Sequence, residues 1–139
     1  MNAKRVLIVD DVEQVRWDLR TALTLSGELE IVGEAANGLE AIHLAESLRP
    51  EVILMDLEMP VLDGYEATRL IRTLFPSCRV VALTVHGYGE ARLKACRSGV
   101  DAFIVKGAPI ESIVQTIVEN IPQTKPGNDV PDDEQSAGL

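Results

Sequence analysis

Short apolar runs rich in β-branched residues alternate with helix-like segments between residues 5 and 121, and this alternation constrains the fold more than any other feature. It is typical of a parallel sheet, because each strand-to-strand crossover needs a helix that packs on one face of the sheet. The sequence therefore predicts an α/β fold of five strand–helix units with helices on both faces. The expected strands are Val6–Val9, Glu30–Ala35, Val52–Met55, Arg79–Leu83 and Ala102–Val105.

Apolar residues in the intervening segments recur at the spacing of one helical face. Gly27 follows the first helix as a C-terminal cap, and Pro109 suits the first turn of the last helix. The first apolar stripe consists of Val12, Val15, Leu19, Ala22 and Leu23. The last consists of Ile110, Ile113, Val114, Ile117, Val118 and Ile121. Weaker amphipathic segments cover Leu39–Leu48, Tyr65–Leu74 and Tyr88–Arg97.

The chain carries a net charge of −9, from 13 basic and 22 acidic residues. A broad nucleic-acid interface or an anionic membrane surface needs the opposite sign of charge, so we expect neither partner for this chain itself. The longest apolar runs are far shorter than a membrane span, and the amino terminus lacks a signal-peptide pattern. Cys78 and Cys96 are expected to be free thiols, and together these features predict a cytoplasmic protein.

The composition changes after Ile121. Residues 122–139 contain three prolines and several acidic residues but almost no large apolar side chain. Such a segment cannot bury enough apolar surface to fold, so we predict a disordered acidic tail. One folded domain, residues 1–121, is expected before it.

Chemically active side chains stand directly after four of the predicted strands. Asp10 and Asp11 follow the first strand, Asp56 the third, Thr84 the fourth and Lys106 the fifth. Parallel strands joined by right-handed crossovers end at one edge of the sheet, and ligands bind at that edge. The sequence therefore predicts a site of three carboxylates, one hydroxyl and one amine.

Crowded carboxylates repel one another unless a cation lies among them or one of them is protonated. Mg²⁺ is the natural ion, with Mn²⁺ as an alternative, because it prefers oxygen ligands and commonly bridges carboxylates to phosphate. Asp56 ends a predicted central strand, where an unpartnered carboxylate is costly, and we interpret it as a nucleophile that attacks phosphorus. Lys106 would neutralise the phosphoryl oxygens, and Thr84 would donate a hydrogen bond to them.

Each of these residues also has a purely structural interpretation. Asp11 could cap the first helix. Asp56 and Lys106 could form an inert salt bridge, although a buried pair gives little net stability. Phe103, seen in isolation, could be an ordinary core residue.

As a set, in this order and spacing, several residues resemble the receiver domains of two-component response regulators over about residues 4–121. They are Asp10-Asp11, Asp56 with Met59-Pro60 and Asp63-Gly64, Thr84, and Phe103 before Lys106. The resemblance implies a flavodoxin-like, doubly wound (βα)5 fold with strand order 2-1-3-4-5. Asp56 would be the phosphoacceptor. Asp11 and Asp56 would bind Mg²⁺ directly, Asp10 through water, and Glu58 through its backbone carbonyl.

The resemblance also implies a switch, in which Thr84 moves toward the phosphoryl group and Phe103 turns inward. The implied partners are a histidine kinase or phosphotransfer protein upstream and a downstream protein or output domain. Dimerisation on phosphorylation is compatible with such a switch. The chain would not be an enzyme beyond its own phosphorylation and slow dephosphorylation.

Three features depart from the common family pattern. Lys106-Gly107-Ala108-Pro109 delays a proline that often follows the lysine directly, as in many receivers that precede helix-turn-helix outputs. Val85 is bulky where the family usually has a small residue, so it should narrow access to the phosphoryl group. Glu58 and His86 occupy positions at which the family tunes the lifetime of the phosphorylated state.

Other functions remain as alternatives. The chain could be the receiver portion of a longer DNA-binding transcription regulator. A magnesium phosphohydrolase with an aspartyl-phosphate would fit Asp56-Leu57-Glu58 loosely, but the sequence has no cap insertion. A flavodoxin-like cofactor carrier would need a Ser/Thr/Gly-rich phosphate loop after the first strand, where two acids stand instead.

Overall fold

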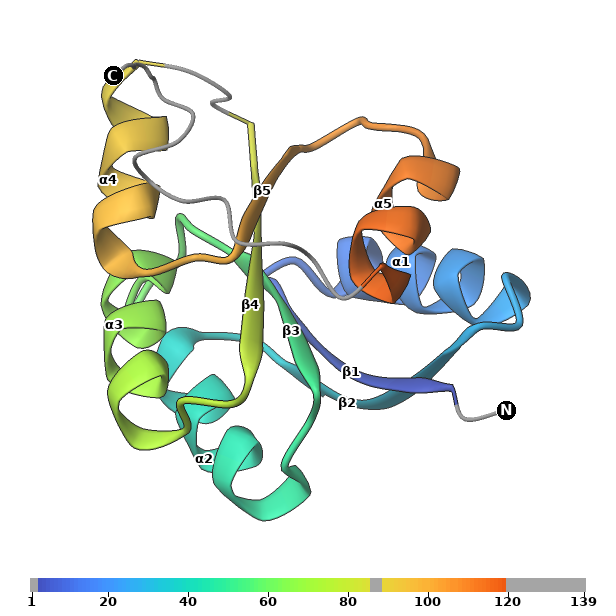
Figure 1. The fold of residues 1–139 in the computed structure, drawn as a ribbon, viewed down its shortest axis with the longest axis horizontal. Helices are drawn as coiled ribbons and strands as arrows, with labels where there is room; N and C mark the ends of the chain where they lie inside the picture. The colour runs from blue at the N-terminus through green and yellow to red at the C-terminus, as the bar shows by residue number, and fades with distance from the viewer. Residues whose placement is uncertain (1–2, 86–88, 120–139) are drawn as a thin grey trace.

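The computed structural model describes residues 3–85 and 89–119. Its parallel strands form one five-stranded sheet of order β2-β1-β3-β4-β5, which confirms the predicted fold class and strand order (Figure 1). The strands are β1 Lys4–Val9, β2 Leu29–Ala35, β3 Val52–Asp56, β4 Arg79–Thr84 and β5 Ala102–Val105. The helices are α1 Glu13–Leu25, α2 Gly38–Leu48, α3 Gly64–Leu74, α4 Glu90–Ser98 and α5 Ile110–Val118.

Two apolar cores lie on the two faces of the sheet. Because side chains alternate along a strand, Leu7 and Val9 enter the core under α2, α3 and α4, whereas Val6 and Ile8 enter the core under α1 and α5. Figure 1 shows the same division, with α1 and α5 on one side of the sheet. All five residues of β3 are buried. The sheet is therefore covered on both faces, and a polar residue at the end of β3 has little access to water.

The carboxyl ends of β3 and β4 extend one residue further than predicted. Asp56 pairs in register with Leu83, and Thr84 pairs with Val105, so both polar residues belong to the ladder. Their backbones are therefore held by the sheet. The side chains at this edge project from rigid strands rather than from loops.

The start of α1 differs from the prediction. Val12 was expected on the buried stripe, but it is the N-cap residue, has extended backbone angles and is 48% exposed. The cause is local: the Val12 amide donates to Asp10 Oδ1 at 2.9 Å, which holds the chain extended until Glu13. Asp11 does not cap α1, since the N-cap is Val12 and makes no side-chain capping bond.

Other predicted features fall beyond the described residues. The predicted boundary at residue 121, the tail 122–139, Ile121, Tyr88 and His86 all lie there. Within residues 3–85 and 89–119, no helix is both long enough and apolar enough to cross a membrane.

Candidate functional site

Three carboxylates meet at the carboxyl edge of the sheet. One oxygen from each of Asp10, Asp11 and Asp56 lies within 4.8 Å of the others. Asp10 is 1% exposed and Asp56 is 4% exposed, while Asp11 is exposed. The structure thus brings together the acids that follow β1 and end β3, with two of them buried and one facing solvent.

The loop after β3 depends on a glycine. The Gly64 amide donates to Leu57 O at 3.0 Å, and Asp63 caps α3 through a 2.9 Å bond from the Glu66 amide. A Cβ atom on Gly64 would lie 2.1 Å from the Asp56 carbonyl oxygen, a contact with backbone that side-chain rotation cannot relieve. Glycine at this position therefore lets α3 begin directly against the end of β3.

Lys106 faces both buried acids. Its Nζ atom lies 3.1 Å from Asp10 Oδ2 and 3.5 Å from Asp56 Oδ1. The Lys106 amide donates to Thr84 O at 2.6 Å, and Gly107 follows with a φ of 97°, which glycine adopts easily. The lysine is therefore shared between two carboxylates, which is not the simple Asp56–Lys106 pair of the structural interpretation.

The electrostatics of Asp56 follow from this crowding. Burial, followed by the charge of Asp10, raises the pKa of Asp56 from 3.8 to about 6, against the opposing effects of Lys106 and the Glu58 amide. Burial alone would lower the pKa of Lys106, but the charges of Asp56 and Asp10 together raise it. Lys106 thus supplies one positive charge for the two buried carboxylates of Asp10 and Asp56, and a further cation would balance the remaining negative charge.

The donor set fits a hard divalent cation. Asp10 Oδ2 is buried and contacts Lys106 Nζ as an ion pair, but it receives no well-directed hydrogen bond from residues 3–85 or 89–119. Asp56 Oδ1 accepts one bond, from the Glu58 amide at 3.2 Å. Carboxylate oxygens with spare lone pairs are the ligands that Mg²⁺ prefers. These acids could therefore hold Mg²⁺.

The predicted switch residues lie on β4 and β5. Thr84 is 1% exposed at the end of β4, and Phe103 on β5 is half-buried. The guanidinium of Arg92, on α4, lies 5.2 Å from the centre of the Phe103 ring. Val85 is 57% exposed directly after Thr84.

Sequence reasoning missed Arg92. No local sequence pattern predicts the contact, because it forms only when α4 packs beside β5 and brings the exposed Arg92 next to Phe103.

Comparisons with known proteins agree with this geometry. The family model described as "Response regulator receiver domain" matches residues 6–118. Response regulator protein VraR of Staphylococcus saprophyticus is 38% identical over 113 residues, which are 81% of this chain and 54% of that protein. The uncharacterized transcriptional regulatory protein YhcZ of Bacillus subtilis is 36% identical over 112 residues, 81% of this chain and 52% of that protein. The chain thus spans about half the length of these curated relatives.

Solved structures show the same fold. The receiver domain of the putative response regulator NarL from Mycobacterium tuberculosis superposes with a TM-score of 0.82 at 29% identity, covering 86% of this chain and 96% of that one. A LuxR-family DNA-binding response regulator from Staphylococcus aureus gives 0.79 at 31% identity, with 84% and 98% covered. A CheX–CheY complex from Borrelia burgdorferi, solved with BeF3 and Mg²⁺, gives 0.76 at 25% identity, with 84% and 87% covered. The fold, the edge cluster and the family match lead to one conclusion: this chain belongs to the response regulator receiver domain family.

Proposed function

We propose that this chain is a phosphorylation-dependent switch of a two-component system, with Asp56 as the phosphoacceptor. The observation that carries the proposal is the position of Asp56: a buried carboxylate at the end of β3, close to Asp10 and Asp11, with Lys106 Nζ 3.5 Å away. The rigid strand holds the nucleophile, and the exposed side of the cluster gives a phosphodonor access. Residues 1–121 would form the switch and residues 122–139 a tail.

The chemistry needs few parts. A carboxylate oxygen of Asp56 would attack the phosphorus of a phosphohistidine, forming a P–O bond as the P–N bond breaks and the nitrogen leaves with the electron pair and takes up a proton. Lys106 would balance the charge of the phosphoryl oxygens, and Thr84 would donate a hydrogen bond to them. When bound, Mg²⁺ would add positive charge next to those oxygens.

The ion would be held by a small set of oxygen ligands. The carboxylates of Asp10, Asp11 and Asp56 and the backbone carbonyl of Glu58 would supply them, Asp10 through water. The CheX–CheY complex of Borrelia burgdorferi, solved with BeF3 and Mg²⁺, supports Mg²⁺ as the ion. Mn²⁺ would serve in place of Mg²⁺.

The output would be a change of surface. Thr84 would move toward the phosphoryl group and Phe103 would turn inward, which would alter the face formed by α4, β5 and α5. A histidine kinase or phosphotransfer protein would act upstream in the cytoplasm, and a downstream protein, an output domain or a second copy of the chain would receive the signal. Each molecule would modify only itself, so the chain would not turn over a substrate.

A second candidate concerns the whole protein. The transcriptional regulatory protein YhcZ, which this chain matches over about half its length, and a LuxR-family DNA-binding response regulator are both similar to this chain. These relatives favour a receiver that controls a DNA-binding domain. DNA binding that depends on phosphorylation of Asp56 in the complete gene product would support it.

The test is labelling by acetyl phosphate in Mg²⁺, followed by intact-mass spectrometry. Wild type should gain one phosphoryl group, and Asp56→Asn should gain none. Asp18→Asn, at an exposed position of α1, is the matched control and should label like wild type. Labelling of Asp56→Asn would contradict the assignment, and multiple turnovers of a phosphate ester would favour a phosphohydrolase.

A further inference from the structure

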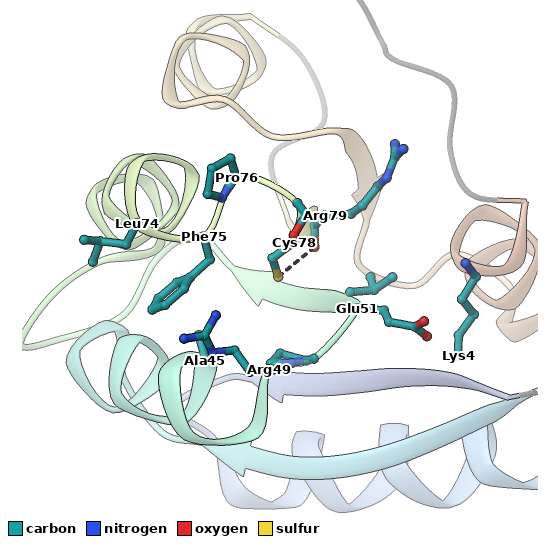
Figure 2. Close-up of a pocket in the computed structure, with 12 residues that line it drawn as sticks. Lys4, Ala45, Arg49, Glu51, Leu74, Phe75, Pro76, Cys78 and Arg79 are labelled. Atoms are coloured by element: carbon teal, nitrogen blue, oxygen red, sulfur yellow. Dashed lines mark hydrogen bonds between the residues drawn. The ribbon is translucent and has the colours of Figure 1, made fainter.

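A cavity lies at the opposite edge of the sheet, where the strands begin. It has a volume of about 570 Å³ and is lined by the first residues of β1, β3 and β4 together with the carboxyl ends of α2 and α3 (Figure 2). Volumes of this size accommodate small organic ligands. None of the residues of the Asp56 cluster lines this cavity.

The charged groups of the lining are mostly cationic. Lys4, Arg49 and Arg79 line the cavity together with one carboxylate, Glu51, whose Oε1 accepts from the Arg5 amide at 3.0 Å. In the described parts of the chain, neither the ammonium of half-buried Lys4 nor the guanidinium of Arg49 has a carboxylate partner. The chain offers 22 acidic residues for 13 basic ones, so carboxylate partners are not scarce. Two unpaired cations beside a hollow therefore indicate a place for an anion.

The end of α2 would ordinarily repel an anion, because the last carbonyls of a helix carry partial negative charge. Here Arg5 covers those carbonyls. Its Nη1 donates to Arg49 O at 2.7 Å, and its Nη2 donates to Leu48 O at 2.7 Å. The partial negative charge at the end of α2 is thus partly compensated by Arg5.

Arg49 is held over the cavity wall. Its guanidinium lies 5.2 Å from the centre of the Phe75 ring, and its Nε donates to Glu46 O at 3.0 Å. Figure 2 shows Arg49 next to Phe75. Its φ is 49°, in the left-handed region that glycine adopts at lower cost. An arginine therefore occupies a helix end where glycine would be easier, and its charge is fixed beside an apolar wall.

We propose that this cavity binds a small organic anion that combines one carboxylate or phosphate head with an apolar body. The head would pair with Arg49, since a guanidinium matches the geometry of both kinds of oxyanion. Lys4, at the other end of the cavity in Figure 2, would add positive charge without contacting the head. The body would pack against Phe75 and Leu74. Glu51 disfavours ligands with several anionic groups, such as nucleoside triphosphates. This site is separate from the proposed phosphorylation site and does not depend on it.

The test is an amide chemical-shift titration of the full chain without divalent ions, using phenyl phosphate, phenylacetate and inorganic phosphate. We expect shifts in residues 45–52 and 74–79 with phenyl phosphate or phenylacetate, and weaker binding of inorganic phosphate because it lacks an apolar body. The tighter of the two organic probes identifies the head. Absence of shifts with both organic probes, equal binding of inorganic phosphate, or shifts confined to the Asp56 cluster would overturn the proposal.

Variants separate this cavity from general charge effects. Arg49→Gln should weaken the better probe by roughly tenfold, the value of one charge-assisted hydrogen bond, and Lys4→Gln should weaken it in the same direction. Arg69→Gln is the matched control, because Arg69 is exposed on α3, pairs with Glu66 and does not line the cavity. If Arg69→Gln lowers the affinity for the probe as much as Arg49→Gln does, or if Arg49→Gln and Lys4→Gln both bind it like wild type, the proposed site is wrong. Acetyl phosphate labelling of the same variants reports on Asp56 independently.

Discussion

Two buried aspartates of this sheet, Asp101 before β5 and Asp56 at the end of β3, have opposite surroundings. Asp101 is 5% exposed and Asp56 is 4% exposed, so their burial is equal. Asp101 Oδ2 accepts from the Val80 amide at 2.8 Å and from Arg72 Nη1 at 3.1 Å. Among the residues that the structure describes, one hydrogen bond reaches Asp56, from the Glu58 amide at 3.2 Å, and Asp56 shares the Lys106 amine with Asp10.

The difference lies in the supply of donors. Burying a carboxylate is costly unless hydrogen bonds and opposite charge compensate. Arg72 serves Asp101 and also donates to Cys78 O at 2.6 Å, so that acid joins α3 to the starts of β4 and β5. At the other edge, burial and Asp10 leave the pKa of Asp56 raised to about 6. Asp101, with its own hydrogen-bond donors, stabilises the fold. Asp56, which shares Lys106 with Asp10, keeps carboxylate lone pairs that a ligand could use.

The strongest test of this comparison removes the structural acid. Asp101→Ala would leave the buried Val80 amide without this acceptor and Arg72 without its carboxylate. We expect the free energy of unfolding to fall by about 3 kcal/mol. Urea denaturation measures it, with Asp18→Ala on the exposed face of α1 expected to change it by less than about 0.5 kcal/mol. A loss below about 1 kcal/mol for Asp101→Ala would show that its donors are not what stabilises this edge.

The second test concerns the pH dependence that Asp56 creates in protein without divalent ions. The pKa of Asp56 is 3.8 in its ordinary state and about 6 in the fold, so the unfolded chain ionises first. The raised pKa therefore lowers the free energy of unfolding. This loss is absent below about pH 4, grows as the pH rises to 6 and then reaches at most about 3 kcal/mol. Asp56→Asn should therefore be more stable than wild type at pH 7 but not at pH 4.

Urea denaturation at a series of pH values, with and without Mg²⁺, measures this effect. Mg²⁺ should stabilise wild type at pH 7 and have much less effect on Asp56→Asn, since one ligand and its charge are lost. If the stability curves of wild type and Asp56→Asn run parallel from pH 4 to pH 7, the crowding of this site has no energetic consequence.

The sequence predicted one of these two aspartates. Asp56 follows an apolar run, and the rule that parallel strands end at one edge placed it beside Asp10 and Lys106. Asp101 gave no such signal, because its donors Val80 and Arg72 lie 21 and 29 residues away. The cavity at the amino edge of the sheet was not predicted for the same reason, because its lining residues come from segments that are far apart in the sequence. Val12 was misplaced because periodicity does not report the Asp10 side chain that holds its amide.

A third test examines access, since the proposed phosphorylation site must admit phosphodonors and water, whereas Asp101 already has its own donors. Val85 is 57% exposed immediately after Thr84, where a bulky side chain should hinder attack on the phosphoryl group. Val85→Ala should speed the decay of phosphorylated protein by roughly fivefold, equivalent to about 1 kcal/mol of barrier. Decay followed by intact mass measures this. Leu25→Ala, far away and 81% exposed, should decay like wild type, and an unchanged rate for Val85→Ala would discard the role of Val85.

The smallest expected effect concerns Arg92, which couples the functional edge to α4. Its guanidinium lies 5.2 Å from the centre of the half-buried Phe103 ring, and an inward turn of that ring would end the contact. On the proposed switch, this contact would favour the resting arrangement, and its loss should favour the active one by about 0.5–1 kcal/mol. Because BeF3 with Mg²⁺ would favour the active arrangement, Arg92→Ala should bind it roughly twofold to fivefold more tightly. Arg97→Ala, in the last turn of the same helix, is the control and should bind it like wild type. Weaker binding by Arg92→Ala would mean that the stacked arginine supports the active state, and the direction assigned to the Phe103 turn would have to be reversed.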